Sequence, residues 1–162
     1  MKEENTYRQT IPSSTTGRYT ALTRKAMRIC YAAHEGQMDK SGVPYVFHPI
    51  HLAEQMETEE EICTALLHDV VEDTKWTLKE LEAEGFPTGV LEAVRLLTRE
   101  KDVPYMAYIE RLSGNQIARK VKLADLEHNS DLTRLIEVTE RDLRRKEKYF
   151  LAKEFLLRQE DT

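Results

Sequence analysis

Residues 65–74, with the sequence ALLHDVVEDT, combine one histidine and three carboxylates with apolar neighbours. If this segment is helical, His68 lies one turn before Glu72, and Asp69 lies one turn before Asp73. A buried carboxylate without a partner is costly, so such a cluster usually pairs with cations, binds a metal or takes up protons. The alternative is a helix end whose acids are simply solvated. This segment alone leaves a metal or catalytic site and a solvated face equally open.

Two further positions repeat this chemistry, although each has an ordinary structural interpretation. His48 stands where a loop meets a helix, so it could be a ligand that is held rigidly and still reached by solvent. A single histidine at such a junction more often starts a helix or packs in a core. Asp125 interrupts an apolar helix face, with Asn129 one turn later. Its ordinary interpretation is a surface acid paired with Lys122 or Lys120.

Two imidazoles and two carboxylates would meet if the fold brought together His48, His68, Asp69 and Asp125. This mixed nitrogen and oxygen set suits Mn²⁺ or Fe²⁺, and less often Zn²⁺, with coordination positions left open for water. A set without thiolates is more typical of a hydrolase than of a structural metal site. The sequence therefore predicts a hydrolytic metal site that depends on how the helices meet.

Helical periodicity dominates the chain, and no segment alternates convincingly as a strand would. Capping boxes begin at Thr58 and Thr77. We expect helices at residues 19–35, 48–56, 61–73, 77–85, 88–98, 104–112, 115–135 and 140–158. The fold class is therefore all-α, a compact multi-helix bundle in which helices supply the side chains of the site.

The last of these segments carries Leu143, Phe150 and Leu157 at intervals of seven residues. Such a stripe is typical of core packing, although it could serve the interface of a homo-oligomer.

Length and composition bound the class of protein. The 162 residues, 40% hydrophobic and 33% charged, suit one domain at residues 19–162 behind a flexible tail at residues 1–18. The formal net charge of −5 argues against a nucleic-acid polymer as partner, but not against a small phosphorylated ligand. We interpret Cys30 and Cys63 as reduced core thiols, which favours the cytoplasm. No apolar run is long enough for a membrane span, and no signal peptide is visible.

Several motifs in order carry a resemblance to a known family. They are His48-Pro49, HDVVEDT at residues 68–74, KLAD at residues 122–125 with Asn129, and the loop at residues 34–45. This pattern, which runs from about Leu22 to Leu135, resembles the HD-domain metal-dependent phosphohydrolases. More narrowly, it is similar to the hydrolase domain of the RelA/SpoT family and its stand-alone small alarmone hydrolases.

The resemblance implies an HD-domain bundle that binds one Mn²⁺ and removes the 3′-pyrophosphate from ppGpp or pppGpp. The implied metal ligands are His48, His68, Asp69 and Asp125. Glu72 and Asp73 would orient the attacking water and move its proton, an effect of roughly 10²- to 10⁴-fold. Lys40 and Asn129 would help to hold the nucleotide.

Two positions depart from the family pattern. Asp39 stands where the family has an arginine that contacts the guanine base, and Leu126 stands where the family commonly has arginine. An acid cannot stack over a base as a cation does. The departure at position 39 favours a second hypothesis, an HD phosphohydrolase that acts on another nucleotide or phosphorylated metabolite. A third hypothesis, a non-catalytic binding module, is opposed by the complete set of ligands.

Overall fold

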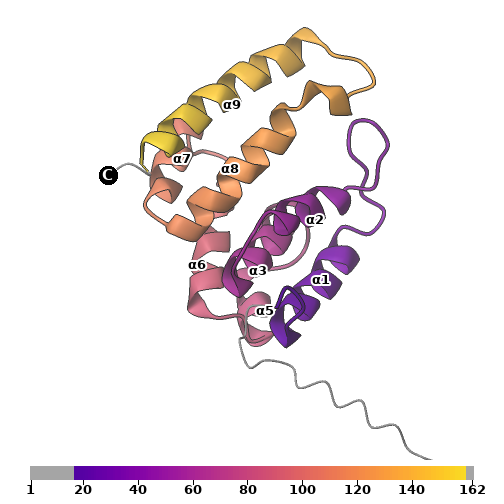
Figure 1. The fold of residues 1–162 in the computed structure, drawn as a ribbon, viewed down its shortest axis with the longest axis vertical. Helices are drawn as coiled ribbons and strands as arrows, with labels where there is room; N and C mark the ends of the chain where they lie inside the picture. The colour runs from indigo at the N-terminus through magenta and orange to yellow at the C-terminus, as the bar shows by residue number, and fades with distance from the viewer. Residues whose placement is uncertain (1–16, 160–162) are drawn as a thin grey trace, which may run out of the picture.

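The computed structural model describes residues 17–159, which form a bundle of helices (Figure 1). The helices are α1 (Ala21–Ala33), α2 (Phe47–Glu54), α3 (Glu59–Leu67), α4 (Val70–Asp73), α5 (Leu78–Ala83), α6 (Thr88–Leu97), α7 (Tyr105–Ser113), α8 (Gln116–Ser130), the 3₁₀ helix η1 (Leu132–Arg134) and α9 (Glu140–Arg158). Extended pairing within this range is limited to an isolated bridge between Met38 and Pro44. The all-α prediction is confirmed.

Helix α3 is the central element, because it packs against α1, α2, α6 and α8. Its residues from Ile62 to Leu67 are all buried. The capping box of Thr58 and Glu61 starts this helix, as the sequence predicts. In Figure 1, α8 and α9 run side by side in the upper part of the view, with α1, α2 and α3 below them. The core therefore surrounds α3, which contacts helices from both the upper and the lower part of the bundle.

The continuous helix predicted at residues 61–73 is wrong, because His68 and Asp69 separate α3 from α4. The ring Nδ1 of His68 lies 2.7 Å from the carbonyl oxygen of Ala65. In an unbroken helix that carbonyl would accept the N–H of Asp69. The side chain thus competes with the helical hydrogen bond, and Asp69 adopts φ −104° and ψ −2°. The interruption falls at two of the residues expected to bind the metal.

The helix predicted at residues 115–135 is also shorter than expected. It ends at Ser130, and η1 follows after Asp131. The carboxylate of Asp131 accepts the N–H of Thr133 at 3.0 Å, so this side chain caps the new turn and does not continue the old one. The ends of the other predicted helices, at 19–35, 48–56, 77–85, 88–98, 104–112 and 140–158, lie within two residues of the observed ends.

Helix α9 turns a different face to the core than its apolar stripe suggests. Leu143, Phe150 and Leu157 are 53%, 59% and 39% exposed, whereas Ala152 and Leu156 are fully buried. Ala152 and Leu156 are one turn apart and define the packed side of the helix. The interpretation of the stripe as core packing is therefore wrong, and the stripe forms an apolar surface of α9.

The tail predicted at residues 1–18 lies outside the described residues, except for Gly17 and Arg18. Arg18 donates a hydrogen bond through Nη1 to the carbonyl of Ala53 at 3.2 Å. Cys30 and Cys63 are free and buried. No helix among residues 17–159 has the length and apolarity needed to cross a bilayer.

Candidate metal centre and its cavity

Three side chains from three helices converge next to α3. His48 comes from the first turn of α2, His68 caps the end of α3, and Asp125 lies within α8. Each offers one potential ligand atom, and these atoms all lie within 4.8 Å of one another. The three residues are only 3%, 3% and 5% exposed. Because α2, α3 and α8 pack against one another, the packing of the core fixes this group.

His48 is oriented through both of its ring nitrogens. Its Nε2 lies 3.0 Å from Oδ1 of Asp125, and its Nδ1 lies 2.7 Å from Nδ1 of His128. Burial, followed by the charge of Arg134, lowers the pKa of His128 to about 4, so that this ring is neutral and able to accept a hydrogen bond. If His48 donates from Nδ1, its Nε2 is free to bind a metal.

His68 has the same arrangement with a backbone partner. The carbonyl of Ala65 accepts from its Nδ1, which leaves Nε2 as the nitrogen directed into the group. This buried Nε2 has no hydrogen-bond partner among the described residues, although a carboxylate oxygen of Asp69 lies 2.9 Å away. Burial lowers the pKa of His68, but the charges of Asp69 and Asp125 outweigh it and raise that pKa to about 9. The site therefore attracts a cation at this nitrogen, and a metal ion fits it.

Asp125 is held as a carboxylate by its neighbours. Its Oδ2 accepts from Nζ of Lys122 and its Oδ1 from Nδ2 of Asn129, each at 2.7 Å. Burial alone would raise its pKa, but Lys122 and then His48 hold the pKa of Asp125 far below its usual range. The sequence suggested Lys122 only as a surface partner, whereas the structure buries this pair.

Asp69 lies beside the group of three but is not one of its mutually close members. Its Oδ2 accepts a hydrogen bond from the hydroxyl of Tyr45, which sequence reasoning did not single out. Burial opposes ionisation of Asp69, but the neighbouring His68 lowers its pKa to about 2. A negative charge is thus available next to the free nitrogen of His68.

The acidic pair Glu72 and Asp73 lies on α4, directly after His68 and Asp69, and both residues are exposed. Glu72 accepts the N–H of Arg99 through Oε1 at 2.6 Å. Although both residues are exposed overall, partial desolvation of their carboxyl groups raises the pKa of each, and the charge of Asp69 raises both further. Carboxyl groups with raised pKa values that solvent can reach are able to take up and release a proton.

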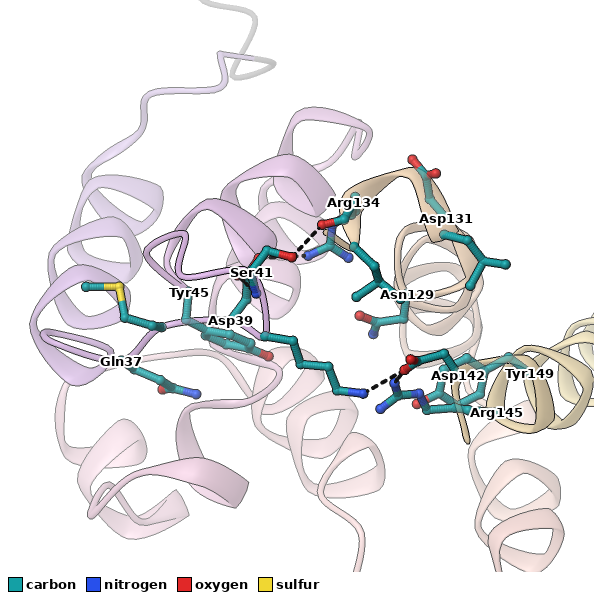
Figure 2. A pocket seen from close by; sticks show the side chains of 14 residues that line it. Gln37, Asp39, Ser41, Tyr45, Asn129, Asp131, Arg134, Asp142, Arg145 and Tyr149 are labelled. Carbon is teal, nitrogen blue, oxygen red and sulfur yellow. Dashed lines mark hydrogen bonds and ion pairs between the residues drawn. The ribbon is translucent and has the colours of Figure 1, made fainter. Parts of the chain in front are cut away.

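A cavity of about 300 Å³ opens beside this group. Its lining comes from the loop at residues 37–45, the end of α8, η1 and the first half of α9, as Figure 2 shows. Tyr45 and Asn129 line it, and these residues contact Asp69 and Asp125. Lys40 lines it as well, with its Nζ 2.9 Å from Oδ1 of Asp142. Both residues expected to hold a nucleotide therefore line one cavity next to the metal centre.

Asp39 stabilises the loop that carries Lys40. Its Oδ1 accepts the N–H groups of Ser41 at 2.8 Å and Val43 at 3.0 Å. Its Oδ2 lies 3.7 Å from Nη2 of Arg134, and the hydroxyl of Ser41 donates to the carbonyl of Arg134 at 2.7 Å (Figure 2). Gly42, at φ +76°, supplies the turn of the loop. The acid that departs from the family pattern thus ties the loop to η1.

Comparison with known proteins finds clear relatives. A search against protein-family models finds no match. A zebrafish (Danio rerio) protein named guanosine-3′,5′-bis(diphosphate) 3′-pyrophosphohydrolase MESH1 is 36% identical over 130 residues, which cover 71% of this chain and 71% of that protein. A Haemophilus influenzae guanosine-3′,5′-bis(diphosphate) 3′-pyrophosphohydrolase is 35% identical over 112 residues. The bifunctional (p)ppGpp synthase/hydrolase SpoT of Escherichia coli is 35% identical over 121 residues.

These bacterial matches cover 60% and 65% of this chain but only 16% and 17% of the two enzymes, so the chain spans about one sixth of their length. A solved structure titled as a metazoan ortholog of SpoT that hydrolyzes ppGpp has a TM-score of 0.69 and 26% identity. That match covers 87% of this chain and 86% of the other.

An all-helical bundle in which two histidines and an aspartate form a group that could hold a metal ion, beside a small cavity, is typical of an HD-type hydrolase domain. The similarity to the zebrafish protein covers most of both chains and identifies the group within that class. The chain belongs to the guanosine-3′,5′-bis(diphosphate) 3′-pyrophosphohydrolase family of RelA/SpoT-type hydrolase domains.

Proposed function

We propose that this protein is a Mn²⁺-dependent hydrolase that converts ppGpp to GDP and pyrophosphate. One observation carries the proposal: the potential ligand atoms of His48, His68 and Asp125 lie within 4.8 Å of one another, beside a cavity lined by Lys40 and Asn129. The zebrafish and Haemophilus relatives are named for this reaction, which supports the assignment.

His48, His68, Asp69 and Asp125 would hold the metal ion. The orphaned Nε2 of His68 and the low pKa of Asp69 support these roles. When bound, a divalent cation provides a nucleophilic hydroxide near neutral pH and offsets negative charge on the phosphate under attack. The ligand set favours Mn²⁺ or Fe²⁺ over Zn²⁺, because it combines imidazole with carboxylate and contains no thiolate.

Glu72 and Asp73 would accept and return the proton that is transferred in the reaction. A carboxylate takes a proton from the attacking water as the water oxygen bonds to the phosphorus that is attached to the ribose 3′-oxygen. The bond between that phosphorus and the ribose oxygen breaks, and pyrophosphate leaves with the oxygen of the water. The carboxylic acid then returns its proton to the ribose 3′-oxygen, which gives GDP. The pKa values of both groups are raised above their ordinary values, which favours uptake of a proton by the carboxylate.

Lys40 and Asn129, which both line the cavity of about 300 Å³, would position the nucleotide. Lys40 offers charge to a phosphate, and Asn129 offers an amide close to Asp125. Their places at the same cavity support binding of a small phosphorylated nucleotide.

A second candidate substrate is another nucleotide or phosphorylated metabolite. The observation that favours it is Asp39, whose carboxylate is engaged by Ser41, Val43 and Arg134. An acid held in this way offers no cationic surface to a guanine base. The metal chemistry would be the same for either substrate.

We further infer one domain at residues 19–162, a homo-oligomer and a cytoplasmic location. The exposed stripe of Leu143, Phe150 and Leu157 supports association through α9. The free, buried thiols of Cys30 and Cys63 support a reducing compartment.

Hydrolysis of ppGpp with added Mn²⁺, followed as the release of pyrophosphate and GDP, tests the function, with Asp69→Ala as the control. We expect turnover by the wild-type protein and none by the variant. A metal-loaded protein without turnover would refute the ppGpp assignment. Turnover of another compound in a parallel panel of nucleotides would then establish the second candidate.

A further inference from the structure

The cavity contains a buried carboxylate that the proposed reaction does not use. Asp142 lies in the first turn of α9 and is 6% exposed. Its Oδ2 accepts the N–H and the hydroxyl of Thr139, at 3.0 and 2.6 Å. Its Oδ1 accepts from Nζ of Lys40 at 2.9 Å and also from Nη2 of Arg145. The Thr139 hydroxyl and Lys40 hold the pKa of Asp142 well below its usual range, so it is ionised at neutral pH.

Asp142 does more than start α9. At α5, Glu80 accepts the same hydrogen bonds from Thr77 while remaining exposed, so a capping box does not require a buried acid. The capping contacts of Asp142 use one carboxylate oxygen, and the other oxygen is turned to two cations at the cavity (Figure 2). One of them, Lys40, comes from a loop 102 positions earlier in the chain.

Each cation that lines the cavity within the described residues is paired with a carboxylate of the protein. Lys40 and Arg145 share Asp142, and Arg134 is paired with Asp39. A phosphate group that approaches Lys40 must therefore compete with a charge already in place. Because the side chain of Lys40 is 52% exposed, it is free to change partners without loss of packing.

We propose that Asp142 is a specificity-determining residue that occupies the place of a substrate phosphate, so that a polyanionic substrate binds by displacing it from Lys40. The identity of the substrate in this proposal rests on the proposed function. Asp142 is then a competitor, within the protein, for the same cation that binds the substrate. Weak anions do not displace a buried carboxylate with four donors, whereas a nucleotide that is also anchored at the metal centre does. Asp142 thus raises the KM of the enzyme in exchange for selectivity.

Asp142→Asn tests this proposal, because the amide keeps a carbonyl for the Thr139 N–H and removes the charge. We expect the KM for ppGpp to fall about two- to fivefold, because the ion pair that is released is of modest strength, with kcat unchanged. A purely structural residue would give the opposite sign, a higher KM or a lower kcat. The matched control is Glu80→Gln at the capping-box acid of α5, which accepts the same hydrogen bonds from Thr77 and does not line the cavity. Its KM should change less than twofold.

Two further measurements distinguish competition at Lys40 from a general change in the charge of the cavity. In a Lys40→Met background, Asp142→Asn should lower the KM by a smaller factor than in the wild-type protein, because only Arg145 is then released. Binding of inorganic pyrophosphate to the metal-free protein, measured by calorimetry, should become tighter in the Asp142→Asn protein by a similar factor. This binding measurement needs no turnover, so it tests the proposal even if ppGpp is not the substrate.

An unchanged or higher KM in a folded Asp142→Asn protein would overturn the proposal. An equally large fall in KM in the Lys40→Met background would overturn it as well. If the amide variant does not fold, Asp142→Ser provides the same test, since its hydroxyl can still accept the N–H of Thr139.

Discussion

The two ends of the site are built in different ways. At the end that we propose to bind a metal, called the metal end, His48, His68 and Asp125 are at most 5% exposed and come from helices that pack against one another. At the outer end, the side chain of Lys40 is 52% exposed and Asn129 is exposed. The outer end is assembled from a loop, the end of α8, η1 and α9, and ion pairs join distant parts of the chain there.

This difference suits the metal end to catalysis and the outer end to substrate recognition. Side chains that are fixed by the core hold their geometry, which a metal ion requires. Side chains that are fixed by exposed ion pairs exchange partners at little cost, which ligand binding requires. Substitutions at the metal end should therefore abolish the reaction, whereas substitutions at the outer end should change affinity and selectivity.

The largest effect is expected for Asp125→Asn. The amide is a poorer metal ligand and leaves Lys122 buried without a charged partner. We expect loss of bound metal and a fall in kcat/KM of at least about 10³-fold, because several kcal/mol of electrostatic stabilisation disappear. Metal analysis by mass spectrometry and ppGpp turnover measure both effects. Asp102→Asn, an exposed acid in a loop, should change neither. Retention of metal by the Asp125 variant would contradict the assignment of the metal end.

The next effect is expected for Asp73→Asn, which removes a candidate base and leaves the ligands intact. We expect kcat to fall roughly 10²- to 10⁴-fold while metal content is unchanged. This split distinguishes proton transfer from metal binding. If Glu72 is the base instead, Glu72→Gln will give the larger loss of the two.

The pH profile of the wild-type enzyme gives an independent check on the same pair. A base works only when ionised, so activity is lost as pH falls through its pKa. Burial raises the pKa values of Glu72 and Asp73 above their ordinary values of 4.5 and 3.8. The acid limb of kcat/KM should accordingly lie above these values and should disappear in the variant that lacks the base. An acid limb that survives in both variants would assign the proton to another group.

A smaller effect is expected for Lys40→Met at the outer end. A charge-assisted hydrogen bond to a phosphate is worth about 1.5 kcal/mol, so KM should rise roughly tenfold. Metal content and kcat should stay the same, because Lys40 contacts Asp142 and no metal ligand. Lys101→Met, in the loop between α6 and α7, is the matched control. A lower kcat with an unchanged KM would show that Lys40 takes part in catalysis and not in substrate binding.

The same division accounts for what the sequence could predict. The helical pattern places His68 and Asp125 among apolar residues, where a polar side chain needs a partner. Only the resemblance to the HD-domain phosphohydrolases joined His48 to them as one set. The break after α3 could not be predicted, because it arises when the His68 ring takes the carbonyl of Ala65. Helix periodicity carries no sign of a side chain that competes with the backbone.

The ion pairs of the outer end are even harder to predict from the sequence. Thr139 and Asp142 have the spacing of a capping box, which marks the start of α9. The cation partner Lys40 lies 102 positions away, and its contact depends on how the turn after α8 places α9 against the loop. The departure at Asp39 was visible in the sequence, but its role in capping the loop was not.

Restoring an arginine with Asp39→Arg should have the smallest effect and tests how the outer end recognises a base. The substitution removes the caps on Ser41 and Val43 and the pairing with Arg134, so we expect Tm to fall by about 2–4 °C for a loss near 1 kcal/mol. A guanidinium that stacks on the base adds about 0.5–1 kcal/mol, a two- to fivefold rise in kcat/KM for ppGpp. Because arginine can also donate hydrogen bonds to O6 and N7 of guanine, the rise should be smaller for the adenosine analogue.

Asp39→Asn is the matched control, because its amide carbonyl can keep a loop cap but adds no cation. If both variants lower Tm and only the arginine changes base preference, position 39 links loop stability to base selectivity. If neither changes base preference, the base lies away from this loop, and Asp39 serves only to hold Lys40 in place.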